Sequence, residues 1–250
     1  MGHHDAIPNG TGSSNPRLNL KTNSWSVVIL VLMASFCSCS YNIYEAAHWG
    51  NTKKVEAYLN GGVDINTPNR WGRTPLAIAL FRKHYDTAKL LIEKGAQINV
   101  VDPLRHVPII LYPVIDGNLE MTRFLIDHGA DVNQADPKGY TALIEAAYHG
   151  HTEIGRLLIE HGADIQAATV GNVTALSNAR GRNHKAFEKM LVDTIEHRER
   201  EALLYRRAKR DATIPAFEAY LKNYPKEKYA KEAQSVKTSQ TMWSPQPLRL

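Results

Sequence analysis

Two short stretches of the chain hold side chains that could bind a metal or form a covalent bond. Cys37 and Cys39 are the two cysteines of this 250-residue chain and are separated by one serine, while His149 and His151 are separated by one glycine. A disulfide within the cysteine pair would be strained, because bridged Cα atoms usually lie about 4.4–6.8 Å apart. A structural metal site needs about four ligands, and neither pair has a partner pair to complete such a set. We therefore expect neither a disulfide nor a bound metal.

Acidic residues recur along the chain, but their spacing does not suggest catalysis. Asp64, Asp131 and Asp164 each follow a glycine by two residues, in the stretches GGVDIN, GADVN and GADIQ. This placement is typical of a turn. The sequence shows no Ser/His/Asp or Cys/His set, no paired-carboxylate motif and no phosphate-binding loop. We expect a protein that is not an enzyme and needs no cofactor.

The N-terminal segment has the organisation of a secretion signal. Residues 1–24 are rich in Gly, Pro, Asn and Ser, and such a segment cannot bury enough apolar surface to order itself. Arg17 and Lys21 then precede about ten apolar or small residues, 27–36, which are too few to span a bilayer but fit the apolar region of a signal peptide. We predict a disordered n-region and signal peptide over residues 1–38. The codon at which translation starts is left open.

The stretch FCSCS that follows resembles a bacterial lipobox, in which a small residue precedes the cysteine that receives the lipid. Cys39 fits this pattern because Ser38 precedes it, whereas Cys37 would follow the bulky Phe36. The resemblance implies that Cys39 is the lipid attachment site and the first residue of a mature outer-membrane lipoprotein that faces the periplasm. Phe36 and Cys37 stand where the pattern prefers other residues. A periplasmic protein, or one with an uncleaved inner-membrane anchor, therefore stays an alternative.

A repeat of 33 or 34 residues organises the middle of the chain. Related stretches such as IEKGAQINV and IDHGADVNQ recur along the chain, and each contains one of the glycines Gly62, Gly95, Gly129 and Gly162. Threonines recur upstream of these glycines, in GRTPLAIAL and GYTALIEAA. The pattern resembles the ankyrin repeat family. This resemblance implies an all-α solenoid of helix–turn–helix units with β-turn tips. We place the solenoid at residues 39–195 and its five units at 41–69, 70–102, 103–136, 137–169 and 170–195.

Elementary helix chemistry supports the same reading. Pro75 fits the first turn of a helix, where its missing N–H needs no partner. Ile154, Leu157 and Leu158 recur at helical spacing and form an apolar stripe, and Gly162 can end that helix in a left-handed conformation. One unit has too little core to be stable alone, so stacking of neighbouring units must supply it.

Some units depart from the pattern. Lys83 and Asn183 replace the glycine of the turn between helices. The third unit has Val107 in place of the threonine and carries Pro113 inside its inner helix, which we expect to kink or break there. Two readings of the third unit stay open: a decayed repeat, or a bend that shapes the concave face for a partner.

The C-terminal part carries the basic charge. The net charge is +5, and residues 196–250 alone hold 12 basic and 7 acidic side chains. No nucleic-acid-binding motif accompanies them, so we expect a solvated helix face. The stretch AFEAYLKNYPKEKYAKEAQ is similar to a tetratricopeptide-type helical hairpin, common in periplasmic proteins. We predict a helical extension over residues 196–235 and a disordered tail over 236–250.

The resemblance to ankyrin repeats implies protein binding through the turn tips and the exposed face of the inner helices. We expect a monomer that acts as a scaffold or adaptor, bound to the membrane by its lipid. The alternative is an immunity protein that neutralises a secreted phospholipase or cell-wall hydrolase. Carried over by position, the binding face consists of Trp71, Arg73, Phe81, Arg82, Leu104, Arg105, His106, Lys138, Tyr140, Tyr148 and His149.

Overall fold

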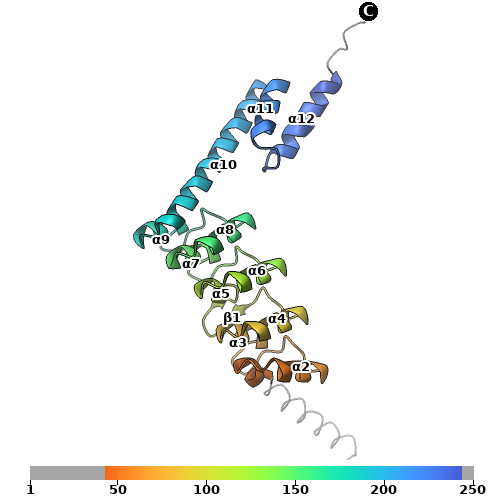
Figure 1. The fold of residues 1–250 in the computed structure, drawn as a ribbon, viewed down its shortest axis with the longest axis vertical. Coiled ribbons are helices and arrows are strands. Elements are labelled where there is room, and N and C mark those ends of the chain that lie inside the picture. The colour runs from red at the N-terminus through yellow and green to blue at the C-terminus, as the bar shows by residue number, and fades with distance from the viewer. Residues whose placement is uncertain (1–42, 244–250) are drawn as a thin grey trace, which may run out of the picture.

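The computed structural model describes residues 43–243, in which a stack of helical hairpins leads into a helical extension (Figure 1). The predicted signal peptide and Cys39 lie outside the described residues. Within residues 43–243, no helix combines the length and the apolar character needed to cross a membrane.

The hairpins form two columns of helices (Figure 1). The inner column begins with a helical segment at 43–48 and continues with α3 (Pro75–Phe81), α5 (Leu111–Ile115), α7 (Ala142–His149) and α9 (Ala175–Gly181). The outer column consists of α2 (Thr52–Asn60), α4 (Tyr85–Glu93), α6 (Leu119–Asp127), α8 (Thr152–Glu160) and the start of α10 (Lys185–Asp211). The all-α ankyrin solenoid that the sequence predicts is confirmed.

The recurring threonines start the inner helices. The hydroxyl oxygens of Thr74, Thr141 and Thr174 each accept a hydrogen bond from the N–H three residues further on, at 3.2, 3.4 and 3.1 Å. These bonds satisfy donors that the first turn of a helix leaves unpaired. The third unit lacks the threonine. There β1 (Val101–Asp102) and β2 (Val107–Pro108) pair as an antiparallel hairpin ahead of α5 instead.

The predicted break at Pro113 is wrong. α5 is continuous through Pro113, but it has five residues, against seven in α3 and eight in α7. The helix begins only at Leu111, so Pro113 falls in its first turn, where a backbone N–H has no intrahelical acceptor anyway. Pro113 therefore lies at the N-terminal end of the helix and does not kink it.

A histidine ring packs on the turn of the preceding unit at three unit boundaries. The His84 ring lies where a Cβ on Gly50 would be, 2.5 Å from it, and its Nε2 is 2.9 Å from the carbonyl oxygen of His48. Gly50 also has a φ of +66°. The same arrangement joins His151 to Gly117 and His184 to Gly150.

The boundary at Lys83 differs. Lys83 also has a positive φ, +62°, although it is not glycine. The next outer helix begins with Asn118 in place of histidine, so no ring presses on the turn. The Lys83 ammonium instead lies 2.6 Å from a carboxylate oxygen of Asp116. The side chain of Lys83 is therefore accommodated because the following unit leaves room for it.

Asparagines join the turn tips of successive units. The Oδ1 atoms of Asn66, Asn99 and Asn133 each accept a hydrogen bond from a backbone N–H of the next unit, at 2.8 Å in every case. The recurring aspartates bend the same turns. Asp131, for example, accepts from the N–H of Asn133 at 2.9 Å. The acidic repeat is thus part of the turn structure, as the sequence suggests.

Two separate cores stabilise the part of the chain that the structure describes. The larger one runs through the stacked units from Ile43 to Leu191, and the smaller one joins Tyr205 of α10 to α11 (Ile214–Asn223) and α12 (Ala230–Trp243). Exposed residues 196–200 of α10 lie between them. α12 continues to Trp243, so the prediction of a disordered tail from residue 236 is wrong for residues 236–243.

Candidate protein-binding groove

A groove of about 640 Å³ opens at the N-terminal end of the stack. It is formed by the inner helix of the first unit, the turn tips of the second and third units, and the inner face of α3. Its lining consists of Tyr44, Glu45, His48, Trp49, Thr67, Pro68, Asn69, Arg70, Trp71, Arg73, Ile78, Arg82 and Leu104.

Three large apolar side chains stand exposed around this groove. The exposed fractions are 70% for Trp49, 50% for Trp71 and 54% for Leu104. Trp49 follows the last residue of the first inner helix, whereas Trp71 and Leu104 lie on successive turn tips. None of the three belongs to either core. Clustered aromatic surface of this kind is typical of protein-binding sites.

Local hydrogen bonds fix the walls of the groove. Asn69 bends the second turn tip, because its Oδ1 accepts from the N–H groups of Trp71 and Arg73, both at 3.0 Å. The Tyr44 hydroxyl donates to the carbonyl oxygen of Thr67 at 2.8 Å. This bond joins the first inner helix to the segment just before the second turn tip. The turn tip that carries Trp71 is therefore positioned by bonds at its own base.

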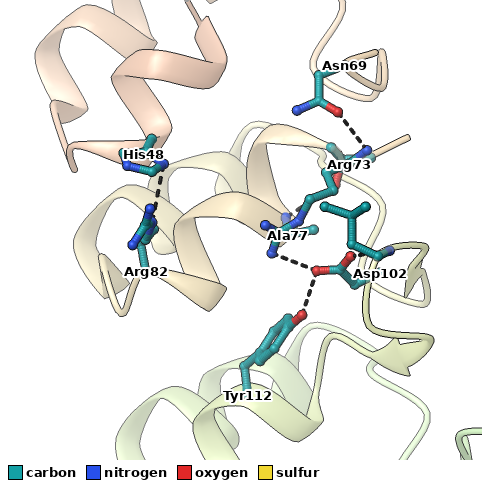
Figure 2. A network of polar contacts seen from close by, with 9 residues as sticks. His48, Asn69, Arg73, Ala77, Arg82, Asp102 and Tyr112 are labelled. Carbon is teal, nitrogen blue, oxygen red and sulfur yellow. Dashed lines mark hydrogen bonds and ion pairs between the residues drawn. The ribbon is translucent and has the colours of Figure 1, made fainter. Parts of the chain in front are cut away.

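A buried ion pair of the second unit lies below the groove, and its carboxylate also contacts the third unit (Figure 2). Asp102 is fully buried, and its Oδ2 lies 2.6 Å from Nη2 of Arg73, whose side chain is 12% exposed. The Tyr112 hydroxyl donates to the same oxygen at 2.5 Å, while Oδ1 accepts from the N–H of Leu104 at 2.9 Å. One carboxylate thus holds the second unit, the third inner helix and the third turn tip together.

The geometry of this pair is that of a charge contact. The Nη2–Oδ2 distance is short, but the N–H direction does not satisfy hydrogen-bond geometry, and Nε of Arg73 is buried with no acceptor. Burial, with the Asp102 hydrogen bond second, raises the pKa of Tyr112 well above its usual range. Tyr112 therefore stays protonated and remains a donor to Asp102.

Arginines gather around the ring of Phe81 beside the groove. The guanidinium carbons of Arg73 and Arg105 each lie 4.4 Å from its centroid, and that of Arg82 lies 5.6 Å away. Nε of Arg82 also donates to Nδ1 of His48 at 3.2 Å. This bond needs an unprotonated His48, and burial followed by the charge of Arg82 lowers the pKa of His48 in agreement with it.

The structure gathers only part of the predicted binding face. Trp71, Arg73, Arg82 and Leu104 line the groove, and Phe81 and Arg105 lie beside it. His106 is exposed on the same turn tip, where its N–H donates to the carbonyl oxygen of Asp102 at 2.7 Å.

The other four predicted residues belong to the fourth unit and are not part of the groove lining: Lys138, Tyr140, Tyr148 and His149. Tyr148 stacks with the guanidinium of Arg182 at 3.6 Å, and His149 lies 3.8 Å from Glu145. The rings of His149 and His151 stack at 5.6 Å. Among residues 43–243 there is no group of three side chains that could hold a metal ion.

Sequence reasoning missed Trp49, which is the most exposed aromatic residue of the groove. The repeat pattern could have indicated it. Trp49 comes directly before the turn residue Gly50, which is the same repeat position that Arg82 occupies before Lys83, and Arg82 belongs to the predicted binding face. Asp102 was missed for a different reason. Its partner Arg73 lies 29 residues away in the chain, and nothing local to either residue indicates the pairing.

Comparison with known proteins agrees with this architecture. The family model "Ankyrin repeats (3 copies)" matches residues 28–102 and 107–169, which is just over half of the chain, and its first part includes residues outside the described range. An ankyrin repeat protein of Escherichia coli, YahD, is 32% identical over 106 residues, or 42% of this chain. The ankyrin repeat-containing protein P1E11.10 of Schizosaccharomyces pombe is 35% identical over 68 residues, or 27% of this chain.

A third relative is the ankyrin repeat and KH domain-containing protein mask-1 of Caenorhabditis elegans, which is 30% identical over 108 residues, or 43% of this chain. The matches span 52%, 33% and 4% of the lengths of these three relatives, so they concern the repeats alone. Ankyrin repeats are protein–protein interaction modules. On the family match and the stacked hairpins, this chain belongs to the ankyrin repeat family.

Proposed function

We propose that this protein captures a partner protein in the groove at the N-terminal end of its solenoid. The observation that supports the proposal is the exposure of Trp49, Trp71 and Leu104 around one groove of about 640 Å³. Tryptophans contribute strongly to binding energy when a partner covers them. The ion pair below the groove holds the turn tip of Leu104 in place, so the surface is preorganised.

Binding is tested by removing the aromatic surface. Tagged protein with Trp49→Ala and Trp71→Ala is compared with wild type in the capture of proteins from envelope extract. The matched control is Leu203→Ala with Val170→Ala, because these residues are 66% and 85% exposed but lie outside the groove. We expect the first pair of changes to abolish capture and the control pair to leave it unchanged. Equal capture by both variants would contradict the proposal.

The proposed location is the periplasmic side of a bacterial outer membrane, where a lipid on Cys39 anchors the mature, monomeric protein. Each buried CH₂ of a lipid chain contributes about 0.8 kcal/mol, and several chains make an anchor effectively permanent. Three residues separate Cys39 from Ile43, the first residue that the structure describes. Since a chain spans at most about 3.6 Å per residue, the groove would lie close to the membrane surface.

Lipid labelling of wild type, Cys39→Ala and Cys37→Ala tests this location. We expect label and membrane retention to be lost in Cys39→Ala alone. Retention of both in Cys39→Ala would refute Cys39 as the attachment site. Membrane retention of a wild type that takes up no label would refute lipidation and favour an uncleaved anchor.

The alternative role is an immunity protein that neutralises a secreted phospholipase or cell-wall hydrolase. It would use the same groove and differ in its partners. When used as bait, an immunity protein would retain one tightly bound toxin, whereas a scaffold or adaptor would retain several envelope proteins. The capture experiment above therefore separates the two roles.

A further inference from the structure

Three arginines around the groove have no acidic partner within residues 43–243. Arg70 and Arg82 line the groove, and Arg105 lies on the neighbouring turn tip. Among the described residues, no carboxylate lies within 4.0 Å of the basic nitrogens of any of the three. All three are exposed. Their charges are therefore available to a ligand.

Aromatic rings hold these arginines in place. The guanidinium carbon of Arg70 lies 4.0 Å from the centroid of the Trp71 ring, and that of Arg105 lies 4.4 Å from the centroid of the Phe81 ring. A guanidinium that stacks through its face keeps the N–H groups of its edge free. Arg82 donates Nε to His48, which leaves its two terminal nitrogens. These contacts order the long side chains in the free protein, so less side-chain entropy is lost when a ligand binds.

The net charge of the groove lining is positive. Its charged side chains are Arg70, Arg73, Arg82 and Glu45. Arg73 is neutralised by Asp102 beneath the groove, so two free guanidinium groups face one carboxylate. A partner that enters this groove is favoured if it brings negative charge.

We infer that the groove binds an acidic peptide segment of the partner, with Asp or Glu carboxylates on Arg70 and Arg82 and an apolar side chain on Trp49, Trp71 or Leu104. Guanidinium and carboxylate match as planar, two-pronged groups, which favours this pairing. The exposed tryptophans and leucine favour a peptide over a small anion, because an anion leaves them uncovered. The inference rests on the proposed function, since it names the chemistry of the segment that the groove captures.

Three labelled dodecapeptides test the inference by fluorescence anisotropy on the purified protein. The first contains Glu and Leu in a Ser background, the second has Lys in place of every Glu, and the third has Ser in place of every Leu. We expect the Glu/Leu peptide to bind at least tenfold more tightly than either of the others, and its affinity to fall as salt is raised. Equal binding of the Lys peptide would overturn the acidic specificity. Equal binding of the third peptide, which keeps Glu but has no Leu, would show that the groove recognises negative charge alone. That result would overturn the assignment of a peptide ligand.

Substitutions of Arg70 and Arg82 test whether these two residues bind the peptide. We expect Arg70→Gln and Arg82→Gln each to weaken the Glu/Leu peptide about tenfold, because each removes a charge-assisted hydrogen bond. The matched control is Arg206→Gln with Arg207→Gln, on the exposed face of α10. An unchanged affinity in both groove variants would overturn the inference. If the arginine variants still capture a partner that the tryptophan variant loses, the proposed function stands and the acidic specificity fails; if all variants capture normally, the proposed function fails too.

Discussion

Replacing Asp102 by Asn should destabilise the protein although it barely changes the shape of the side chain. Asn can still accept the N–H of Leu104 through Oδ1, because Asn69 performs that task in the preceding unit. The substitution removes the charge that faces Arg73, and it puts an NH2 group, which donates and cannot accept, where Oδ2 of Asp102 accepts the Tyr112 hydroxyl. It is thus a change in electrostatics at nearly constant packing.

The expected loss follows from the burial of the pair. Removing one partner of a buried ion pair costs about 3–5 kcal/mol, because the other charge is left uncompensated. The Arg73 side chain is 12% exposed and stacks on Phe81, so part of its charge can be stabilised by water and by the ring. We therefore expect a loss of about 2–3 kcal/mol in the free energy of unfolding. In a chain of this size, this corresponds to a fall of about 4–12 °C in the melting temperature.

Urea unfolding is the assay, and Asp136→Asn is the matched control. Asp136 occupies the corresponding position at the end of the third unit, where its Oδ1 accepts from the N–H groups of Lys138 and Tyr140 at 2.9 and 2.8 Å. Among the described residues, no basic nitrogen lies within 4.0 Å of its carboxylate. We expect the control to lose less than about 1 kcal/mol. Circular dichroism reports on the whole chain, and tryptophan fluorescence combines the signals of Trp49 and Trp71 in the first two units with those of Trp25 and Trp243.

Two results would refute this reasoning. The first is an equal loss in Asp102→Asn and Asp136→Asn, which would mean that the charge facing Arg73 contributes nothing. The second concerns the double variant Asp102→Asn with Arg73→Gln. If the uncompensated charge causes the loss, removing that charge recovers part of the stability, whereas simple addition of the two single losses would show that the residues are not coupled.

Three further predictions follow from packing and charge. Gly155→Ala should cost about 1–3 kcal/mol despite the better helix propensity of Ala, because the new Cβ would lie 2.4 Å from the buried ring of Phe187; urea unfolding measures the loss, and a gain in stability would contradict it. Gly150→Ala should be more destabilising than Gly162→Ala in the same assay. Both glycines have positive φ, but only the first has a histidine ring 2.6 Å from the Cβ position, and equal losses would contradict the ring contact. Burial, with the charge of Asp136 second, raises the pKa of Glu145 above its usual 4.5. Its ionised form therefore destabilises the fold increasingly as the pH rises above 4.5, so Glu145→Gln should stabilise the protein at pH 7 but not below pH 4; an equal effect at both pH values would contradict this.

The features that the sequence predicted are those that depend on local chemistry. Thr74 caps its own helix, and Gly162 ends another with φ of +87°, so a periodic sequence suffices to predict the hairpins. Pro113 was misjudged because α5 begins only at Leu111, which places the proline in the first turn of the helix and not in its interior. The pairing of Arg73 with Asp102 joins the two ends of the second unit, 29 residues apart, and a single sequence carries no sign of it.

The histidine contacts at the unit boundaries restrict how this chain can have grown. A unit that begins its outer helix with histidine can follow only a turn without a side chain, as at Gly50, Gly117 and Gly150. A tandem duplication of the second unit would place a copy of His84 on Lys83, and loss of the third unit would place His151 there. Both events would place a histidine ring where the Cβ atom of Lys83 lies. The order of the units is therefore part of the information in the sequence, and recombination that ignores it should yield chains that fail to stack.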